Sequence, residues 1–234
     1  MNFPRDFDRS RGFYRIHMDI VFLILQCIGV VSFAVTGTII AIQKRLDVIG
    51  ALVFALLTSF GGGMIRDIIT GNVPRLFLQR DYYIMEAFCI ATSLFCFHIA
   101  FIPCVGKFLA KHQHNFILEF TDAIGLALFC VLGVDCTRAL VGENAAPILL
   151  IFGGFITSVG GGMLRDICSA QIPSIFRKNI YLIPAVIGAT LYVITAQFIP
   201  QMLALSISAA LIIAIRLLAY FFKWNMPVHK EKDA

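Results

Sequence analysis

Long apolar stretches alternate with short polar segments along most of the chain. An α-helix needs about 20 apolar residues, at a rise of about 1.5 Å each, to cross a hydrocarbon core of about 30 Å. Seven stretches approach this length and predict seven transmembrane helices. Their approximate ranges are 18–43, 48–70, 82–103, 116–138, 147–169, 180–199 and 201–222. Residues 1–17 and 223–234 are polar and are expected to form the two terminal tails.

The last two predicted helices are expected to form a hairpin. The 36 residues from Ile180 to Ile215 contain no charged residue, which is too long for one crossing and suits two. The segment QFIPQ at 197–201 is the expected turn, because proline ends a helix. Arg216 is the first charge after this run, and we expect it to close the hairpin.

The composition agrees with a membrane protein. Hydrophobic residues make up 59% of the chain and charged residues only 14%, whereas soluble domains carry about 25% charged residues. The net charge of +5 is spread over loops and tails. There is no basic run with interleaved aromatic residues, so nucleic acid is not an expected partner. No nucleophile–base pair, metal cluster or cofactor motif is present, so neither an enzyme nor a cofactor is predicted.

One ten-residue motif occurs twice. GGGMIRDIIT at 61–70 and GGGMLRDICS at 160–169 agree at seven of ten positions. The same offset aligns Pro74 with Pro173. A periodic match of this kind is the signature of an internal repeat.

A second match extends the repeat towards the N-terminus. FAVTG at 33–37 resembles FCVLG at 129–133, with a slightly different offset. We therefore interpret the chain as a duplication, with one three-helix repeat over 18–103, a second over 116–199, and an added helix at 201–222.

An odd number of helices in each repeat has a topological consequence. The second copy must enter the membrane from the opposite side, so the two copies form an inverted repeat. Inverted repeats place a site or pathway at their interface, built from interrupted helices. The predicted fold is an all-α integral membrane protein with an inverted 3+3 repeat and one C-terminal helix.

Glycine triplets interrupt the second and fifth predicted helices. The glycines are Gly61, Gly62, Gly63, Gly160, Gly161 and Gly162. Each costs a helix about 1 kcal/mol relative to alanine. A stretch without side chains permits a kink, a backbone that faces an aqueous cavity, or close packing of two helices.

Polar residues flank both triplets and favour a kink that lines a polar pathway over packing alone. The residues before the triplets are Thr58, Ser59, Thr157 and Ser158, and those after them are Arg66, Asp67, Arg165 and Asp166. Chain neighbours on a helix diverge by about 100°, so Arg66 and Asp67 are not expected to satisfy each other as one pair. Arg66 lies far enough along its helix to snorkel or to cap the C-terminus.

Asp67 fits a capping role poorly, because a carboxylate near a helix C-terminus is electrostatically unfavourable. Buried polar pairing that shapes a water-filled path is therefore favoured, with Arg66 and Arg165 at opposite ends. Asp122 is a further pathway candidate, whereas Glu119 fits a place at the membrane interface. A transient monovalent cation near the triplets is compatible with this arrangement, and no other metal site is predicted.

The doubled motif, GGGMIRDIITGNVP and GGGMLRDICSAQIP with a seventh helix behind, resembles the trimeric intracellular cation (TRIC) channel family, especially prokaryotic members also labelled possible glycine transporters. The resemblance covers about 18–222. It implies a homotrimer with a pore in each subunit, walled by helices two and five that bend at the triplets. It also implies conduction of monovalent cations, chiefly potassium.

Two functions remain open on the sequence. A passive channel for potassium or sodium is the leading hypothesis, and a secondary transporter of a small amino acid such as glycine is the alternative. Animal members of the TRIC family have a longer, basic C-terminal tail, so the resemblance implies a bacterial inner membrane rather than an intracellular store for this sequence. The predicted side with the N-terminal tail carries seven Lys and Arg residues, and the side with the C-terminal tail carries nine, which favours a cytoplasmic C-terminus. Membrane lipids are expected to surround the helices.

Overall fold

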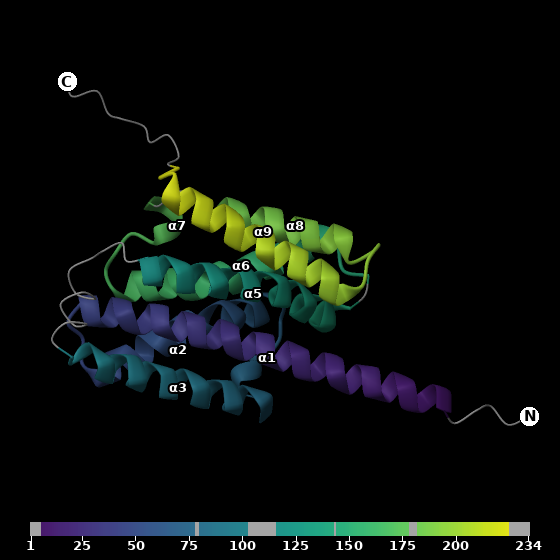
Figure 1. The fold of residues 1–234 in the computed structure, drawn as a ribbon, viewed down its shortest axis with the longest axis horizontal. Helices are drawn as coiled ribbons and strands as arrows, with labels where there is room; N and C mark the ends of the chain where they lie inside the picture. Colours follow the sequence, from purple (N-terminus) through teal and green to yellow (C-terminus); the bar gives the residue numbers. More distant parts are fainter. Residues whose placement is uncertain (1–5, 78–79, 103–115, 143, 178–181, 225–234) are drawn as a thin grey trace, which may run out of the picture.

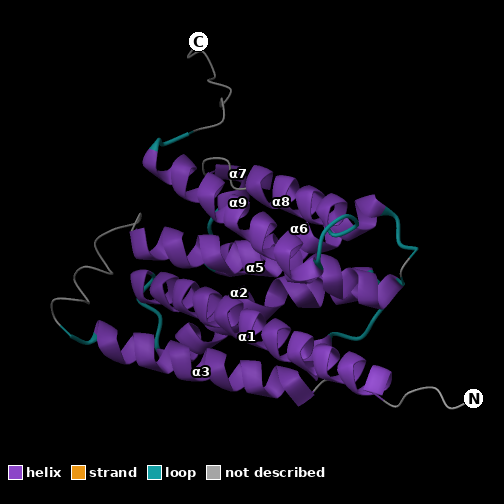
Figure 2. Ribbon diagram, turned by 45° about the vertical axis from the view of Figure 1, so that its right-hand side comes forward, coloured by secondary structure: helices purple, strands orange, loops and turns teal. Residues whose placement is uncertain are grey.

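The computed structural model describes residues 6–77, 80–102, 116–142, 144–177 and 182–224. Within these ranges the regular structure is helical and no strand is present (Figure 2). The first half consists of α1 (Asp6–Gln43), α2 (Val48–Ile69), the 3-10 turn η1 (Arg75–Phe77) and α3 (Arg80–Ala100). The second half consists of α5 (Phe116–Val141), α6 (Pro147–Cys168), α7 (Ser174–Arg177), α8 (Leu182–Thr195) and α9 (Gln201–Phe221).

Five helices in the described ranges are long and apolar enough to cross a membrane, namely Ile20–Gln43, Val48–Ile69, Phe116–Val141, Pro147–Cys168 and Gln201–Phe221. The other two predicted spans correspond to α3 and α8, whose apolar helical parts, Phe88–Ala100 and Leu182–Thr195, are shorter. The all-helical membrane architecture is confirmed, and the count of seven crossings stays a prediction. Helix α1 begins at Asp6, within the predicted tail at 1–17.

The helix ends follow local sequence signals. Asp47 caps α2, because its side chain accepts a hydrogen bond of 2.8 Å from the Gly50 amide. Pro147 opens α6, where a missing N–H costs nothing. Pro200 is the N-cap residue of α9, so the chain turns between Thr195 and Gln201, as predicted for the hairpin.

The two halves pack against each other through α1, α2, α5 and α6 (Figure 1). Helix α2 packs on α6 and α1 packs on α5, while α3 lies outside the first half. Helix α9 packs against α5 and α8 on the outside of the second half. Helices α2 and α6, which carry the glycine triplets, therefore lie at the centre of the bundle.

The contact between α1 and α5 is built from residues that are equivalent in the two repeats. The rings of Phe33 and Phe129 stack with their centroids 5.2 Å apart. Gly125 lies beneath Phe33, since an added Cβ would come within 2.3 Å of the ring. Gly29 faces Phe129 in the same manner, at 3.2 Å. Each half contributes one phenylalanine and one glycine, as a duplicated sequence predicts.

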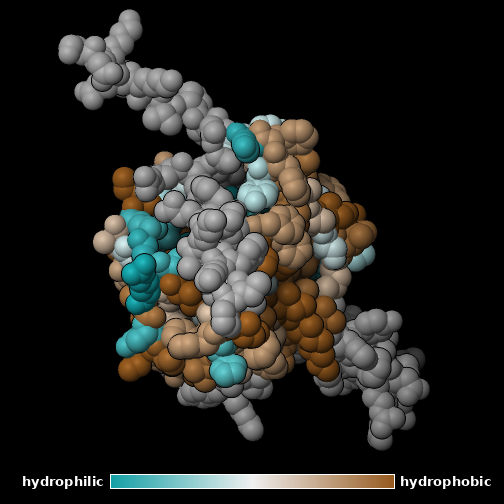
Figure 3. Space-filling model, turned by 60° about the vertical axis from the view of Figure 1, so that its left-hand side comes forward, coloured by the Kyte–Doolittle hydropathy of each residue, from teal (hydrophilic) through white to brown (hydrophobic). Residues whose placement is uncertain are grey.

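The outer surface carries many large apolar side chains. Ile148 is 73% exposed, and Phe95 and Phe221 are more than 60% exposed. In Figure 3, hydrophobic residues cover most of the coloured surface on the right-hand side, and hydrophilic residues gather mainly at the left. Exposed apolar surface of this extent matches a lipid-facing exterior rather than a water-facing one.

Candidate functional site

The two glycine triplets meet where α2 crosses α6. A Cβ added to Gly62 would lie 2.1 Å from the backbone oxygen of Thr157, and one added to Gly161 would lie 2.1 Å from that of Thr58. The two contacts are equivalent under the 99-residue offset. Because residue numbers increase in opposite directions across the contact, the helices cross antiparallel. The glycines therefore allow the two backbones to touch, which no larger residue would permit.

Close packing thus accounts for part of the triplet sequence. The α-helical assignment continues through both triplets, in Val48–Ile69 and Pro147–Cys168. The bend that we predicted there stays a prediction. Gly63, the third glycine of the first triplet, differs from the others because it lines a cavity described below.

A second pair of glycines brings the neighbouring helices close to the crossing. Gly37 of α1 faces the backbone oxygen of Phe54, which would lie 2.5 Å from an added Cβ. Gly133 of α5 faces the side chain of Thr157, at 2.7 Å. Gly37 and Gly133 are the final residues of the matching FAVTG and FCVLG segments. The central four helices are therefore held together by glycine contacts that occur once in each repeat.

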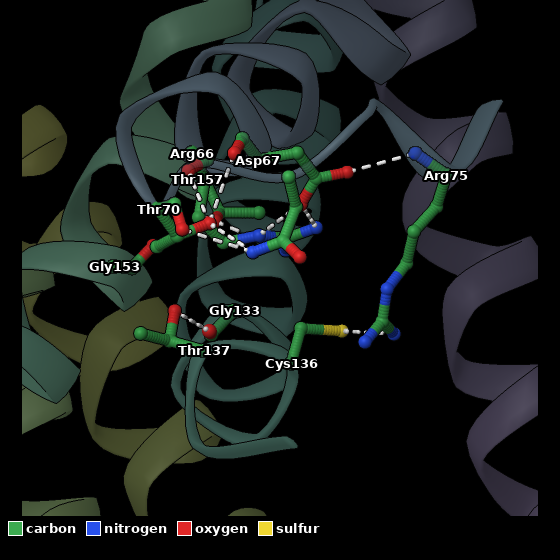
Figure 4. A network of polar contacts seen from close by, with 10 residues as sticks. Arg66, Asp67, Thr70, Arg75, Gly133, Cys136, Thr137, Gly153 and Thr157 are labelled. Carbon is green, nitrogen blue, oxygen red and sulfur yellow. Dashed lines mark hydrogen bonds and ion pairs between the residues drawn. The ribbon is translucent and has the colours of Figure 1, made fainter. Parts of the chain in front are cut away.

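In each motif the arginine forms an ion pair with the aspartate that follows it in the chain. Nε and Nη2 of Arg66 donate to Oδ1 of Asp67 at 2.9 and 2.6 Å (Figure 4). Arg165 and Asp166 repeat this geometry at 2.9 and 2.8 Å. The prediction that chain neighbours could not satisfy each other was wrong, because the long arginine side chain folds back along its own helix to reach the adjacent carboxylate.

Both arginines are buried rather than directed to the membrane surface. Arg66 and Arg165 are each 3% exposed, which rules out snorkelling to solvent within this chain. Nη1 of Arg66 also donates to the Thr157 hydroxyl at 3.3 Å, across the crossing. Arg66 therefore links α2 to α6, which an arginine directed towards solvent would not do.

The second carboxylate oxygen of each aspartate holds the chain that follows the helix. Oδ2 of Asp67 accepts a hydrogen bond of 2.9 Å from the Arg75 amide (Figure 4). Oδ2 of Asp166 accepts bonds of 2.8 Å from both the amide and the hydroxyl of Ser174. This double role explains an aspartate near a helix C-terminus, because its charge is matched by an arginine and its free oxygen fastens the following turn.

The turn after each helix is also duplicated. Gly71 and its counterpart Ala170 both adopt positive φ, at 75° and 53°. The Asn72 amide donates to the Asp67 backbone oxygen at 2.8 Å, as expected of a helix that ends in a left-handed residue. Glycine suits that position and alanine is strained there, so the second copy carries a cost that the first does not.

A cavity of about 40 Å³ lies beside the first Arg–Asp pair. Its polar lining comes from both halves and comprises Gln26, Ser59, Arg66, Asp67, Cys136 and Thr157. Arg75 lies next to this lining, with its guanidinium 3.8 Å from the sulfur of Cys136. The predicted site residues Ser59, Gly63, Arg66, Asp67 and Thr157 are therefore brought together at one place.

A cavity of about 20 Å³ lies beside the second Arg–Asp pair. It is lined by Thr36, Ile40, Leu118, Glu119, Asp122, Arg165 and Ser174. An adjoining hollow includes Gly162, Arg165 and Asp166. Under the repeat, Asp122 corresponds to Gln26 and Arg165 to Arg66, so the two cavities are equivalent positions in the two halves. They lie on opposite sides of the α2–α6 crossing.

The remaining predicted residues serve the helix contacts. The hydroxyls of Thr58 and Thr157 donate to backbone oxygens one turn earlier, each at 2.6 Å. Ser59 donates to the Val30 oxygen of α1 at 3.1 Å, and Ser158 to the Phe155 oxygen at 2.8 Å. Gly61 and Gly160 face the opposite triplet. These residues support the site, and Ser158 is fully buried.

The partner of Asp122 was not foreseen. Nη2 of Arg216, on α9, lies 2.8 Å from Oδ2 of Asp122 and 3.1 Å from Oε2 of Glu119. Arg216 is only 6% exposed and Glu119 is 9% exposed. Arg216 is therefore not an exposed charge closing the hairpin, and Glu119 is buried within the chain. The sequence did not indicate this role, because Arg216 follows a charge-free run and was interpreted as the charge that closes the hairpin.

A further buried contact joins α5 to α8. The hydroxyl of Tyr192, which is completely buried, donates to Oδ2 of Asp135 at 2.6 Å. Arg138 lies 3.6 Å from the other oxygen of the same carboxylate. The sequence offers no sign of this pairing, since the two residues are 57 positions apart and occupy unmatched positions in the repeat.

Comparisons with known proteins find related sequences over most of the chain. A sequence profile described as glycine transporter matches residues 23–99 and 119–197, one segment in each repeat. A UPF0126 membrane protein of Deinococcus radiodurans is 33% identical over 179 residues, which cover 75% of this chain and 77% of the relative. The UPF0126 inner membrane protein YadS of Escherichia coli K12 is 30% identical over 205 residues, covering 86% and 92%.

Solved structures share the fold. A structure that describes conductance through TRIC cation channels is 33% identical, with a TM-score of 0.75 over 90% of this chain and 98% of its own. The TRIC channel orthologue of Rhodobacter sphaeroides is 30% identical, with a TM-score of 0.74 over 87% and 98%. This chain therefore belongs to the TRIC family of membrane proteins, the family whose sequence profile is described as glycine transporter.

Proposed function

We propose that this protein is a channel for monovalent cations, chiefly potassium, with a pathway through each subunit of a homotrimer. The observation that carries the proposal is the pair of equivalent polar cavities on opposite sides of the α2–α6 crossing. Similarity to TRIC cation channels supports it. In this proposal the pathway joins the two cavities past the triplets, where α2 and α6 bend to open it.

The charges at the cavities are compatible with cation passage. A fixed arginine would repel potassium, but Arg66 and Arg165 each have an aspartate oxygen within 3 Å. Such a pair has no net charge, so the barrier to an approaching cation is much smaller than that of an isolated arginine. In this proposal Arg66 organises one part of the pathway by binding Thr157 and Asp67, and Arg165 organises the other by binding Asp166.

The alternative of glycine transport has weaker support from the geometry. A substrate carboxylate would need an arginine, and Asp67 and Asp166 already occupy that place.

Planar-bilayer recording of the purified protein under a potassium gradient tests the proposal. We expect discrete current steps. Their reversal potential should lie close to the equilibrium potential of potassium and far from that of the anion. Silent bilayers, combined with saturable glycine uptake into liposomes, would establish the transporter instead.

Crosslinking of the detergent-solubilised protein tests the proposed trimer separately. The proposed bacterial inner-membrane location follows the relatives, and the cytoplasmic C-terminus is checked by tag accessibility in intact cells.

A further inference from the structure

We propose that Arg216, on α9, determines the cation selectivity of the pathway by offsetting the charges of Glu119 and Asp122. The inference rests on the proposed channel function and adds a residue of α9 to it. It begins from the geometry, since one guanidinium nitrogen lies 2.8 Å from Asp122 and 3.1 Å from Glu119. All three residues are at least nine-tenths buried in the structure.

The acidic pair lies at the cavity and not merely near it. Glu119 and Asp122 line the second cavity together with Arg165, which is the pathway arginine of that half. They are separated by three positions on α5, so they lie on one face of that helix. A cation in this cavity therefore lies beside both carboxylates and Arg165, and the charge of Arg216 acts at the same place.

The two cavities differ in charge although their positions are equivalent. The first cavity is lined by one arginine and one aspartate, Arg66 and Asp67, and Arg75 lies beside it against Cys136, so these three residues have a formal charge of +1. Its positions equivalent to Asp122 and Glu119 carry Gln26 and Leu23, which are uncharged. Both halves therefore have the Arg–Asp ion pair, whereas only the second half has the acidic pair Glu119 and Asp122.

The second half also has the helix that supplies the countercharge. Three carboxylates, Glu119, Asp122 and Asp166, face two arginines, Arg165 and Arg216, which leaves a formal charge of −1. The 13 residues at 103–115 that follow the first repeat are too few for a spanning helix, so that repeat has no equivalent of α9. Without Arg216 the second cavity would have a formal charge of −2.

Position within α9 supports a role beyond holding the helix in place. Arg216 is residue 16 of the 21 residues in α9, about one turn and a half before its end at Phe221. The other side chains that α9 buries are small or apolar, among them Ala204, Leu205 and Ile212. These contacts already attach α9 to the bundle, so the buried arginine is not required for attachment alone.

The test compares permeability ratios for potassium over chloride in planar bilayers. R216Q makes the cavity more negative, and we expect the ratio to rise about threefold to tenfold, the Boltzmann factor of one charge several ångströms from the ion. E119Q makes it less negative, and we expect a fall of similar size. The double variant E119Q/R216Q conserves the wild-type charge and should return the ratio to the wild-type value. R216K keeps the charge and should also leave it unchanged.

Several results separate a selectivity role from a structural one. The matched control is R138Q, which removes an arginine that pairs with Asp135 elsewhere on α5, and it should leave the ratio unchanged. If R216Q fails to fold, E119Q and the double variant E119Q/R216Q still test the inference. A double variant with the same potassium-over-chloride permeability ratio as E119Q overturns it. A conducting wild type whose ratio is unaffected by R216Q also overturns it. A folded but silent wild type would overturn the proposed channel itself.

Discussion

Replacing Gly62 by alanine, and separately Gly63, separates close packing from the proposed pathway within one triplet. An added Cβ at Gly62 would lie 2.1 Å from the Thr157 backbone oxygen, whereas ordinary contact begins at 3.4 Å. The two backbones would have to move apart by about 1.3 Å, because a carbonyl oxygen in a helix cannot rotate away. At Gly63 the nearest atom is Nη2 of Arg66 at 3.8 Å, which leaves room for a methyl group.

The magnitudes follow from comparing the two variants. Both substitutions gain about 1 kcal/mol of helix propensity, so this term cancels in the difference. Overpacking a tight contact costs about 1–3 kcal/mol. We therefore expect the free energy of unfolding of G62A to lie about 1–3 kcal/mol below that of G63A. For a chain of this size, 1 kcal/mol corresponds to a Tm shift of about 2–4 °C.

Thermal unfolding of the two purified variants in detergent, followed by size exclusion, measures this difference. The equivalent variant G161A should behave like G62A, since its added Cβ would meet the Thr58 oxygen at 2.1 Å. Equal stability of G62A and G63A would show that the helices do not cross at these glycines. If G63A is stable but has altered conductance, the third glycine faces the pathway, as its place in the cavity lining suggests.

Two further perturbations test the duplicated helix ends. Ala170 has φ of 53° where the first repeat has Gly71, so A170G should stabilise the protein by up to about 1 kcal/mol and G71A should destabilise it by about 1–2 kcal/mol, measured as shifts in Tm. D67N removes one charge of a buried ion pair whose carboxylate also accepts a hydrogen bond from the Arg75 amide. We expect the free energy of unfolding in denaturant to fall by about 3–5 kcal/mol and to recover partly in R66Q/D67N. An unchanged unfolding midpoint would contradict the structural role of this ion pair.

The all-helical membrane fold could be predicted from the apolar stretches of the sequence, and the doubled motif directed attention to contacts that occur in both halves. Gly62 and Gly161 make equivalent contacts with Thr157 and Thr58. Both copies contain the residues that determine the contact, and a glycine at a crossing has no substitute of similar size. By contrast, the bend at the triplets depends on small changes in backbone geometry, which composition does not determine.

The pairing of charges was harder to predict than their burial. Arg66 and Asp67 were expected to diverge because their Cα–Cβ bonds point about 100° apart. That argument holds for short side chains, but Nε and Nη2 of an arginine lie several bonds from the backbone and reach back to Oδ1. Once the Arg75 amide holds Oδ2, the carboxylate is oriented towards its neighbour.

Arg216 shows why the second half of the site could not be deduced from the motif. Its partners, Glu119 and Asp122, are on α5, 97 and 94 residues away, and lie outside both copies of the glycine motif. Whether they meet depends on the rotation of α9 about its axis, which is set by packing of Ala204, Leu205 and Ile212. Motif comparison identifies what the two halves share, and so it directs attention to the symmetric arginines. The charge difference between the two cavities arises from what the halves do not share, and only their arrangement in space reveals it.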